Sequence, residues 1–216
     1  MIKTYNTEEY NFHDIVSKVF EINDLSKIHE LRKDLHPNNK LNFDNESKTK
    51  FHQHFYKNLH DGNLLELEKS YMSFIANEIK PLFSESILFQ YMPSFRVHLP
   101  GDQAIHKWHY DADDDHRHPE WEINFFIPLT NSLDTQTIWF ESIPGLRDFS
   151  PANMSYGQYL IFYGNKCTHG NKVNMTDSAR VSFDFRIIPS SRFKNNQKTS
   201  ATTNIKFTEG QYYRRM

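Results

Sequence analysis

The spacing of apolar residues changes along the chain, and this change limits the possible folds more than any other feature of the sequence. Up to about residue 85, apolar residues recur every three or four positions, which is typical of one face of a helix. From about residue 86 they alternate with polar residues, which is typical of a strand with one buried face. The sequence therefore predicts helices followed by a sheet.

The helical part contains three apolar stripes. In chain order they are Leu25, Ile28, Leu31 and Leu35, ended by Pro37; Phe51, Phe55 and Leu59, with Ser47 as a candidate N-cap and Gly62 beyond the end; and Leu67, Tyr71, Phe74 and Ile75, before Pro81. Each stripe covers one face of its helix, so we interpret these residues as core contacts rather than as ligands.

The alternating part contains seven candidate strands. They are Ser86–Tyr91, Ser94–Leu99, Ile105–Asp111, Trp121–Leu129, Gln136–Glu141, Gly157–Tyr163 and Arg180–Ile188. Short strands with no helical pattern between them indicate a β-sandwich or jelly roll and not a parallel βαβ sheet. We therefore expect a mainly β fold, a double-stranded β-helix (jelly roll, cupin-like) with the N-terminal helices packed on one sheet.

A chain of 216 residues suits one domain with a sizeable core. We expect residues 1–85 to form its helical part, 86–189 its jelly-roll core and 190–216 a polar C-terminal extension. The 25 basic and 27 acidic residues give a net charge of −2, which does not favour a nucleic-acid partner. The sequence gives no indication of the oligomeric state.

Two further observations concern the cellular compartment. No apolar run has the length of a signal peptide or a membrane span, so no membrane partner is expected. Cys167 is the only cysteine, which excludes an intramolecular disulfide and a thiolate zinc cluster. Both observations favour a reducing compartment, and we expect a cytoplasmic protein.

Three groups of polar residues predict a metal centre with a cosubstrate. His109 and Asp111 are two positions apart near the end of a predicted strand, so they project from the same face. His169 follows a later strand. Two imidazoles and one carboxylate occupy one face of an octahedral Fe(II) and leave its other positions open. Arg180 and Ser182 share one face of the last strand, where a guanidinium binds a carboxylate through two hydrogen bonds.

Each group alone has a simpler explanation. An H-x-D tripeptide is more often a hydrogen-bonded pair on the surface, and a single histidine in a turn is more often an ordinary loop residue. Arg180 alone is more often a solvated strand residue. The order of the three groups inside an alternating, all-β pattern is what favours a site.

Several stretches between about residues 90 and 190 carry a family resemblance. They are Phe95–Pro100, His109–Asp111, Glu122–Asn124, Pro128–Thr130, Ile138–Ser142, His169–Asn171 with Asn174, and Arg180–Arg186. Through them the chain resembles the non-haem Fe(II)/2-oxoglutarate-dependent dioxygenases, and within that superfamily the StrG-type proteins named from streptomycin biosynthesis. The resemblance implies that His109, Asp111 and His169 bind Fe(II). It also implies that Arg180 forms a salt bridge with the distal carboxylate of 2-oxoglutarate, helped by Ser182.

The resemblance further implies an enzyme that uses O₂ to hydroxylate, desaturate or cyclise a small polar metabolite, such as a sugar or aminocyclitol derivative. The remaining candidates are Asn124 for the cosubstrate, and Arg96, Trp108, Trp139, Glu141 and Arg186 for the substrate. For each of the substrate candidates, packing or a solvated face is an equally good interpretation.

One stretch, Asp113–His118, expands the segment after the H-x-D motif. It is followed by a second pair, His118 and Glu120, which Pro119 disfavours as a strand pair. Its aspartates form either a solvated turn, which is the simpler interpretation, or a surface that attracts a cationic substrate.

Two other functions fit the same pattern. A cupin-type isomerase or dioxygenase would use the same three ligands without 2-oxoglutarate, and would leave Arg180 without a role. A jelly-roll carbohydrate-binding module would bind no Fe(II), and would give no reason for two histidines and an aspartate at these positions.

Overall fold

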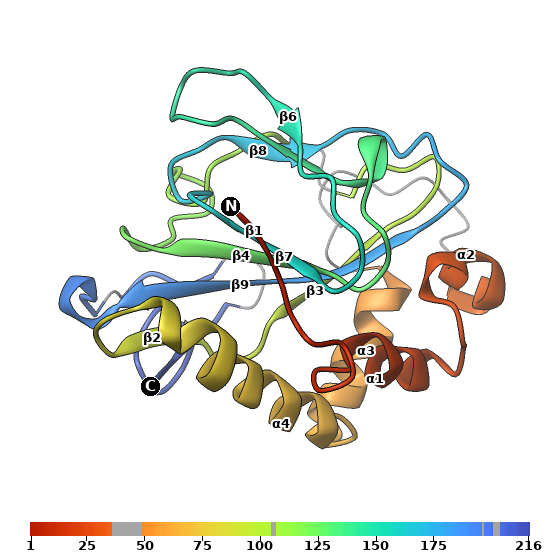
Figure 1. The fold of residues 1–216 in the computed structure, drawn as a ribbon, viewed down its shortest axis with the longest axis horizontal. Helices are drawn as coiled ribbons and strands as arrows, with labels where there is room; N and C mark the ends of the chain where they lie inside the picture. The colour runs from red at the N-terminus through yellow and green to blue at the C-terminus, as the bar shows by residue number, and fades with distance from the viewer. Residues whose placement is uncertain (36–48, 105–106, 196, 201–203) are drawn as a thin grey trace.

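The computed structural model describes residues 1–35, 49–104, 107–195, 197–200 and 204–216. Two antiparallel sheets form its upper layers, and helices cover the outer face of the larger sheet (Figure 1). Among the described residues, none of the helices has the length and apolar character required to cross a bilayer. The two sheets, with helices on the larger one, confirm the expected mainly β fold with N-terminal helices packed on one sheet.

The larger sheet has seven strands and the smaller has three. The larger contains β1 (Ile2–Thr4), β2 (Ile87–Gln90), β3 (Ser94–His98), β4 (Ile123–Pro128), β7 (Gln158–Phe162), β9 (Arg180–Pro189) and β10 (Tyr213–Arg215). The smaller contains β5 (Ile138–Phe140), β6 (Ser150–Pro151) and β8 (His169–Asn171). The order β1-β7-β4-β9-β2-β10 leaves the larger sheet open, with β3 also paired to β9. A closed jelly-roll barrel is therefore not formed by the described residues.

Strand β9 organises the larger sheet. It pairs with β4 along one edge and with β3 and then β2 along the other. In this register Arg186 lies opposite Asn124, and Ser182 lies opposite Arg96. The alternate residues Val181 and Phe183 belong to the core. The apolar row of β9 thus faces the helices, and its polar row faces the space between the two sheets.

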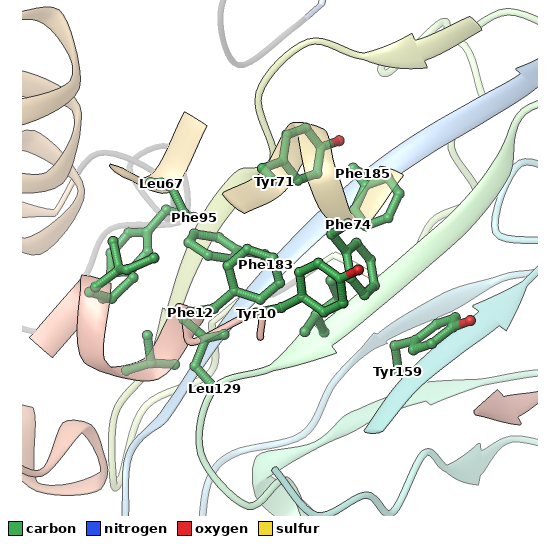
Figure 2. Close-up of a cluster of buried hydrophobic side chains, with 14 of the residues drawn as sticks. Tyr10, Phe12, Leu67, Tyr71, Phe74, Phe95, Leu129, Tyr159, Phe183 and Phe185 are labelled. Carbon is green, nitrogen blue, oxygen red and sulfur yellow. The ribbon is translucent and has the colours of Figure 1, made fainter. Parts of the chain in front are cut away.

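The helices pack beneath this apolar row. They are α1 (Phe12–Phe20), η1 (Leu25–Lys27), α2 (Ile28–Leu31), η2 (Lys33–Leu35), α3 (Lys50–His60), α4 (Leu65–Phe74), the π-helical turn η4 (Ile75–Ile79) and η5 (Lys80–Leu82). Two short 3₁₀ turns, η6 (Asp134–Gln136) and η7 (Ser190–Arg192), lie among the strands. Aromatic rings fill the interface between helices and sheet (Figure 2). Phe55 and Phe95 stack with centroids 4.3 Å apart, and Phe125 and Phe185 with centroids 5.0 Å apart.

Several predicted elements differ from the structure. The segment predicted as a strand at Ile105–Asp111 is irregular over 107–111, where only an isolated bridge pairs His109 with His169, and 105–106 lie outside the described residues. The single helix predicted from Leu25 to Leu35 is broken into η1, α2 and η2, because the side chain of Asp24 accepts the Ser26 backbone N–H and starts a separate short turn. Pro37 and Ser47 lie outside the described residues.

The remaining expected helices are present with adjusted ends. Thr49 provides the N-cap of α3, through a side chain that accepts the backbone N–H of His52. The third helix is extended beyond Phe74 by the π-helical turn η4. The stretch expected to be a polar C-terminal extension contributes the edge strand β10 to the larger sheet.

Candidate metal centre

His109 and His169 are brought together by the backbone rather than by a continuous strand. The backbone N–H of His109 donates to the carbonyl of His169 (3.0 Å), and the N–H of His169 donates to the carbonyl of His109 (2.8 Å). This reciprocal pair sets the two imidazole rings side by side, with centroids 4.6 Å apart. Asp111 is anchored separately, through its N–H to the carbonyl of Gly164 (2.9 Å).

The two rings present the same nitrogen to the site. Nδ1 of His109 lies 2.9 Å from the carbonyl oxygen of Lys107, and Nδ1 of His169 lies 3.0 Å from that of Cys167. A carbonyl accepts only, so each Nδ1 carries the hydrogen and each Nε2 keeps a free lone pair. The backbone carbonyl of Cys167 thus orients a candidate ligand.

The Oδ1 atom of Asp111 completes the cluster. It lies 3.6 Å from Nε2 of His109 and 3.5 Å from Nε2 of His169. The ligand atoms of the three residues lie within 4.8 Å of one another, and all three residues are buried. Adjacent ligands of an octahedral metal are about 3 Å apart, so a small contraction around an ion would complete the geometry.

The charge states of these groups suit a metal. Burial and the neighbouring His169 lower the pKa of His109 to about 3. Burial also lowers the pKa of His169. For Asp111, burial alone would raise the pKa, but the Arg186 guanidinium and nearby histidines outweigh it and hold the pKa well below its usual range. The cluster therefore offers two neutral imidazoles and one carboxylate, which are the protonation states that metal binding requires.

Arg180 lies in the same cavity as the two histidines and lacks a counter-ion. Its side chain is buried, Nη1 donates to the carbonyl of Gln136 (3.0 Å), and Nε has no hydrogen-bond partner. Within the described part of the chain, no carboxylate lies within ion-pair distance of this guanidinium. Burial lowers the pKa of Arg180 to about 9. Among the described residues, Oδ1 of Asn124 in the same cavity and buried Oγ of Ser182, on the same face of β9 as Arg180, also lack hydrogen-bond partners.

Two residues predicted as substrate contacts, Arg96 and Arg186, line the cavity but are held in ion pairs. Nε of Arg96 binds Asp184 at 2.7 Å, and Nη1 of Arg186 binds the other oxygen of Asp184. Nε and Nη2 of Arg186 each lie 3.0 Å from Oδ2 of Asp111. Asp184, which links the two guanidinium groups, was not singled out by the sequence, because an acidic residue in an alternating strand is usually solvated.

The other three substrate candidates lie outside this cavity. Trp108 packs against Phe149, with centroids 4.5 Å apart. Nε1 of Trp139 donates to the carbonyl of Asp134 (3.1 Å). Glu141 accepts the backbone N–H groups of Thr168 (2.6 Å) and Arg147 (2.9 Å), and although burial opposes it, these bonds lower the pKa of Glu141 to about 2.

The second predicted pair, His118 with Glu120, is not formed. Glu120 is exposed and faces Lys166 (4.0 Å), because Pro119 and the turn around it direct the two side chains apart. His118 instead pairs with Glu122 (Nδ1 to Oε2, 2.8 Å), and the hydroxyl of Tyr213 donates to Oε1 of Glu122.

Asp111, His118 and Glu122 also lie close enough to hold a metal ion. The atoms they would offer are already engaged, however. Oδ2 of Asp111 is bonded to Arg186, and both oxygens of Glu122 have partners. We therefore interpret this second cluster as a hydrogen-bonded wall behind Asp111.

The acidic loop is largely balanced by its own neighbours. Oδ1 of Asp113 accepts the N–H of His116 (2.8 Å) and lies 2.7 Å from its Nδ1. Asp115 pairs with Lys107. The His116 ring stacks on His109, with centroids 4.0 Å apart. These contacts favour the turn interpretation over a free acidic surface.

The chain is similar in sequence to a curated protein. Streptomycin biosynthesis protein StrG from Streptomyces griseus is 35% identical over 129 residues, which cover 60% of this chain and 60% of StrG. The match thus spans less than two thirds of the length of that relative. No family model matches the chain.

Solved structures with a related arrangement are more distant. CytC3 with Fe(II) and alpha-ketoglutarate matches 88% of this chain and 71% of its own, with a TM-score of 0.47 and 17% identity. HygX from Streptomyces hygroscopicus, with nickel and 2-oxoglutarate bound, matches 93% of this chain and 87% of its own, with a TM-score of 0.46 and 9% identity. At these values the likeness assigns neither a fold nor a chemistry to this chain.

Proposed function

We propose that the protein is an Fe(II)- and 2-oxoglutarate-dependent oxygenase. The observation that carries the proposal is the buried guanidinium of Arg180, unpaired with any described carboxylate, in the cavity lined by His109 and His169. A buried charge without a partner is costly. A dicarboxylate that binds a metal at one end and Arg180 at the other would remove that cost. Similarity to StrG supports a role in the biosynthesis of a small polar metabolite.

The residues of the cavity divide into two groups under this proposal. Nε2 of His109, Nε2 of His169 and Oδ1 of Asp111 would hold Fe(II), for which two imidazoles and a carboxylate are a characteristic set. Arg180 would bind the distal carboxylate in a two-hydrogen-bond pair, with Ser182 as a further donor. The metal, O₂ and the cosubstrate together supply the oxidising chemistry when bound.

The chain's own contribution is to bind, to orient and to keep water out. The cavity has a volume of about 50 Å³, which is room for a few water molecules. Binding of a dicarboxylate therefore requires apolar lining residues such as Phe126 and Phe162 to move apart. The same apolar residues would exclude solvent from the metal once the cosubstrate is in place.

The proposal extends to the organisation of the whole chain. We propose that the two sheets are the two layers of an opened jelly roll, and that residues 1–216 form a single domain in the cytoplasm. For the substrate, the similarity to a streptomycin biosynthesis protein supports a sugar or aminocyclitol derivative. Trp108, Trp139 and Glu141 keep no direct ligand role in this proposal, because each lies outside the cavity. Asn124 lines the cavity and stays a candidate for the cosubstrate, since its Oδ1 has no partner among the described residues.

The direct test is succinate formation from 2-oxoglutarate by the purified protein with Fe(II), ascorbate and O₂, without a primary substrate. We expect slow uncoupled turnover that is lost in His169→Ala and in Arg180→Met, while circular dichroism shows both variants folded. Fe(II) binding without consumption of 2-oxoglutarate would support a cupin-type enzyme instead. Failure to bind Fe(II) at all would overturn the proposal and favour a carbohydrate-binding module.

A further inference from the structure

The two oxygens of Asp111 have different surroundings. Oδ1 faces Nε2 of His109 and of His169, at 3.6 and 3.5 Å. Oδ2 accepts Nδ2 of Asn124 at 2.7 Å and is also bound by Nε and Nη2 of Arg186, each at 3.0 Å. One oxygen is therefore directed at the metal position, and the other is fully occupied by protein donors.

The backbone of Asp111 is held by two hydrogen bonds, from its N–H to the carbonyl of Gly164 (2.9 Å) and from the N–H of His118 to its carbonyl (2.9 Å), which place the residue but leave its carboxylate free to rotate about the side-chain bonds. Residues around Asp111 form turns and an isolated bridge, without a ladder of strand hydrogen bonds. The carboxylate direction must therefore be set through side chains. Asn124 and Arg186 are well suited to this, because they lie opposite each other on the paired strands β4 and β9, which are central in the larger sheet.

Arg186 is itself fixed in place by a row of alternating charges. Its Nη1 binds Asp184, and the other oxygen of Asp184 accepts Nε of Arg96 at 2.7 Å. The side chains of this row are largely buried, and Arg186 and Asp184 are two positions apart on one face of β9. The row therefore connects a rigid strand to a carboxylate in an irregular loop.

We infer that Arg186, assisted by Asn124, is a positioning residue that makes Asp111 a one-oxygen metal ligand. This inference rests on the proposed metal site. By holding Oδ2, the pair prevents Asp111 from chelating with both oxygens and leaves an additional coordination position for cosubstrate or O₂. Arg186 accordingly acts through Asp111. The sequence had instead suggested Arg186 as a residue that contacts the substrate.

The test measures metal binding in the absence of any turnover. Wild type, Arg186→Met and Arg186→Lys are titrated with Co²⁺ by calorimetry, and the visible spectrum of bound Co²⁺ is recorded. Loss of a ligand's outer partner typically costs 10–100-fold in metal affinity. We expect a loss of that order in Arg186→Met together with a changed Co²⁺ spectrum. Arg186→Lys should recover part of the affinity, because lysine restores the charge but not the planar fork.

Two further variants make the outcome decisive. Arg192→Met is the control, since Arg192 lies over the exposed ring of Trp121 at the surface and does not line the cavity, and it should keep wild-type Co²⁺ affinity. Asn124→Leu tests the same role if Arg186→Met does not fold, and should also weaken binding and alter the spectrum. Wild-type affinity and spectrum in both Arg186→Met and Asn124→Leu would overturn the inference. Absence of Co²⁺ binding in wild type would instead overturn the metal site, and with it the proposed function.

Discussion

Among single residues, Arg180 combines two properties that normally exclude each other. It is among the largest fully buried side chains, and within the described residues its guanidinium has one hydrogen bond, to the Gln136 carbonyl. His98, the residue opposite it on β3, has both ring nitrogens against backbone carbonyls, and an imidazole is neutral or cationic, so His98 does not supply an anion. A buried charge without a counter-ion reduces the stability of the ligand-free protein.

This leads to a prediction in which stability and binding change in opposite directions. Arg180→Met replaces an uncompensated buried charge with an apolar side chain of similar length. We expect the free energy of unfolding of the ligand-free protein to rise by about 1–4 kcal/mol. In the same variant, the apparent KM for 2-oxoglutarate should rise by an amount equivalent to about 2–5 kcal/mol, or turnover should vanish.

Urea unfolding and succinate assays on the same preparations would check both parts. Arg192→Met is a suitable control, because Arg192 lies over the exposed ring of Trp121 at the surface, and it should change neither quantity beyond a few tenths of a kcal/mol. A marked loss of stability in Arg180→Met would show that a partner anion is already present.

The sequence predicted the identity of the clustered residues better than their surroundings. His109, Asp111 and His169 do converge, but through a reciprocal backbone pair and not through the expected strand. The contact of Arg186 with Asp111 was not predictable, because Asp111 is distant in sequence and lies in a turn outside β4 and β9. The alternation of side chains along a strand predicts which of them share a face of the sheet. It does not predict which distant residues those side chains contact.

At the level of elements, short strands were the ones that the sequence did not reveal. Strands β1, β8 and β10 have three residues each, which is too short for an alternating pattern to stand out. The ten-residue strand β9 was predicted almost to its ends, because its alternation is long and regular. These short strands are held in the sheet by contacts with residues that are distant in sequence. The clearest example is β10, which pairs with β2.

Strand β10 carries Tyr213, whose hydroxyl donates to a fully buried oxygen of Glu122. We predict that Tyr213→Phe lowers the free energy of unfolding by about 1–3 kcal/mol, since it leaves a buried carboxylate oxygen without its donor. Chemical denaturation at neutral pH measures the change. Tyr91→Phe is the matched control, because it removes a hydroxyl that donates to the partly exposed Glu68, and the loss there should be smaller. Equal losses in the two variants would contradict a special contribution from the buried pair.

For the whole molecule, buried histidines link stability to pH. His52 is enclosed between helix α3 and the sheet, and burial, followed by the nearby charge of Arg96, lowers its pKa to about 3. In the unfolded chain the same group titrates near its ordinary value of 6.5. Between these two values the unfolded state binds a proton that the native state does not, so this histidine makes stability fall as the pH falls below about 6.5.

The corresponding prediction concerns His52→Gln. A proton that the unfolded state binds and the native state does not changes the free energy of unfolding by about 1.4 kcal/mol per pH unit. Between about pH 7.5 and 5, wild type should therefore lose about 2 kcal/mol more stability than the variant. Urea unfolding at a series of pH values measures the two slopes, and identical slopes would mean that His52 becomes protonated without unfolding.

The two edges of the larger sheet come from opposite ends of the described sequence. Strand β1 pairs with β7, and β10 pairs with β2, so each edge forms only after a very long loop has closed. Such non-local pairings slow folding, because the loop entropy is lost before the contacts are gained. Until both ends have docked, β7 and β2 present unpaired backbone groups that another chain can occupy. We therefore expect the yield of native protein on refolding to fall as the protein concentration rises.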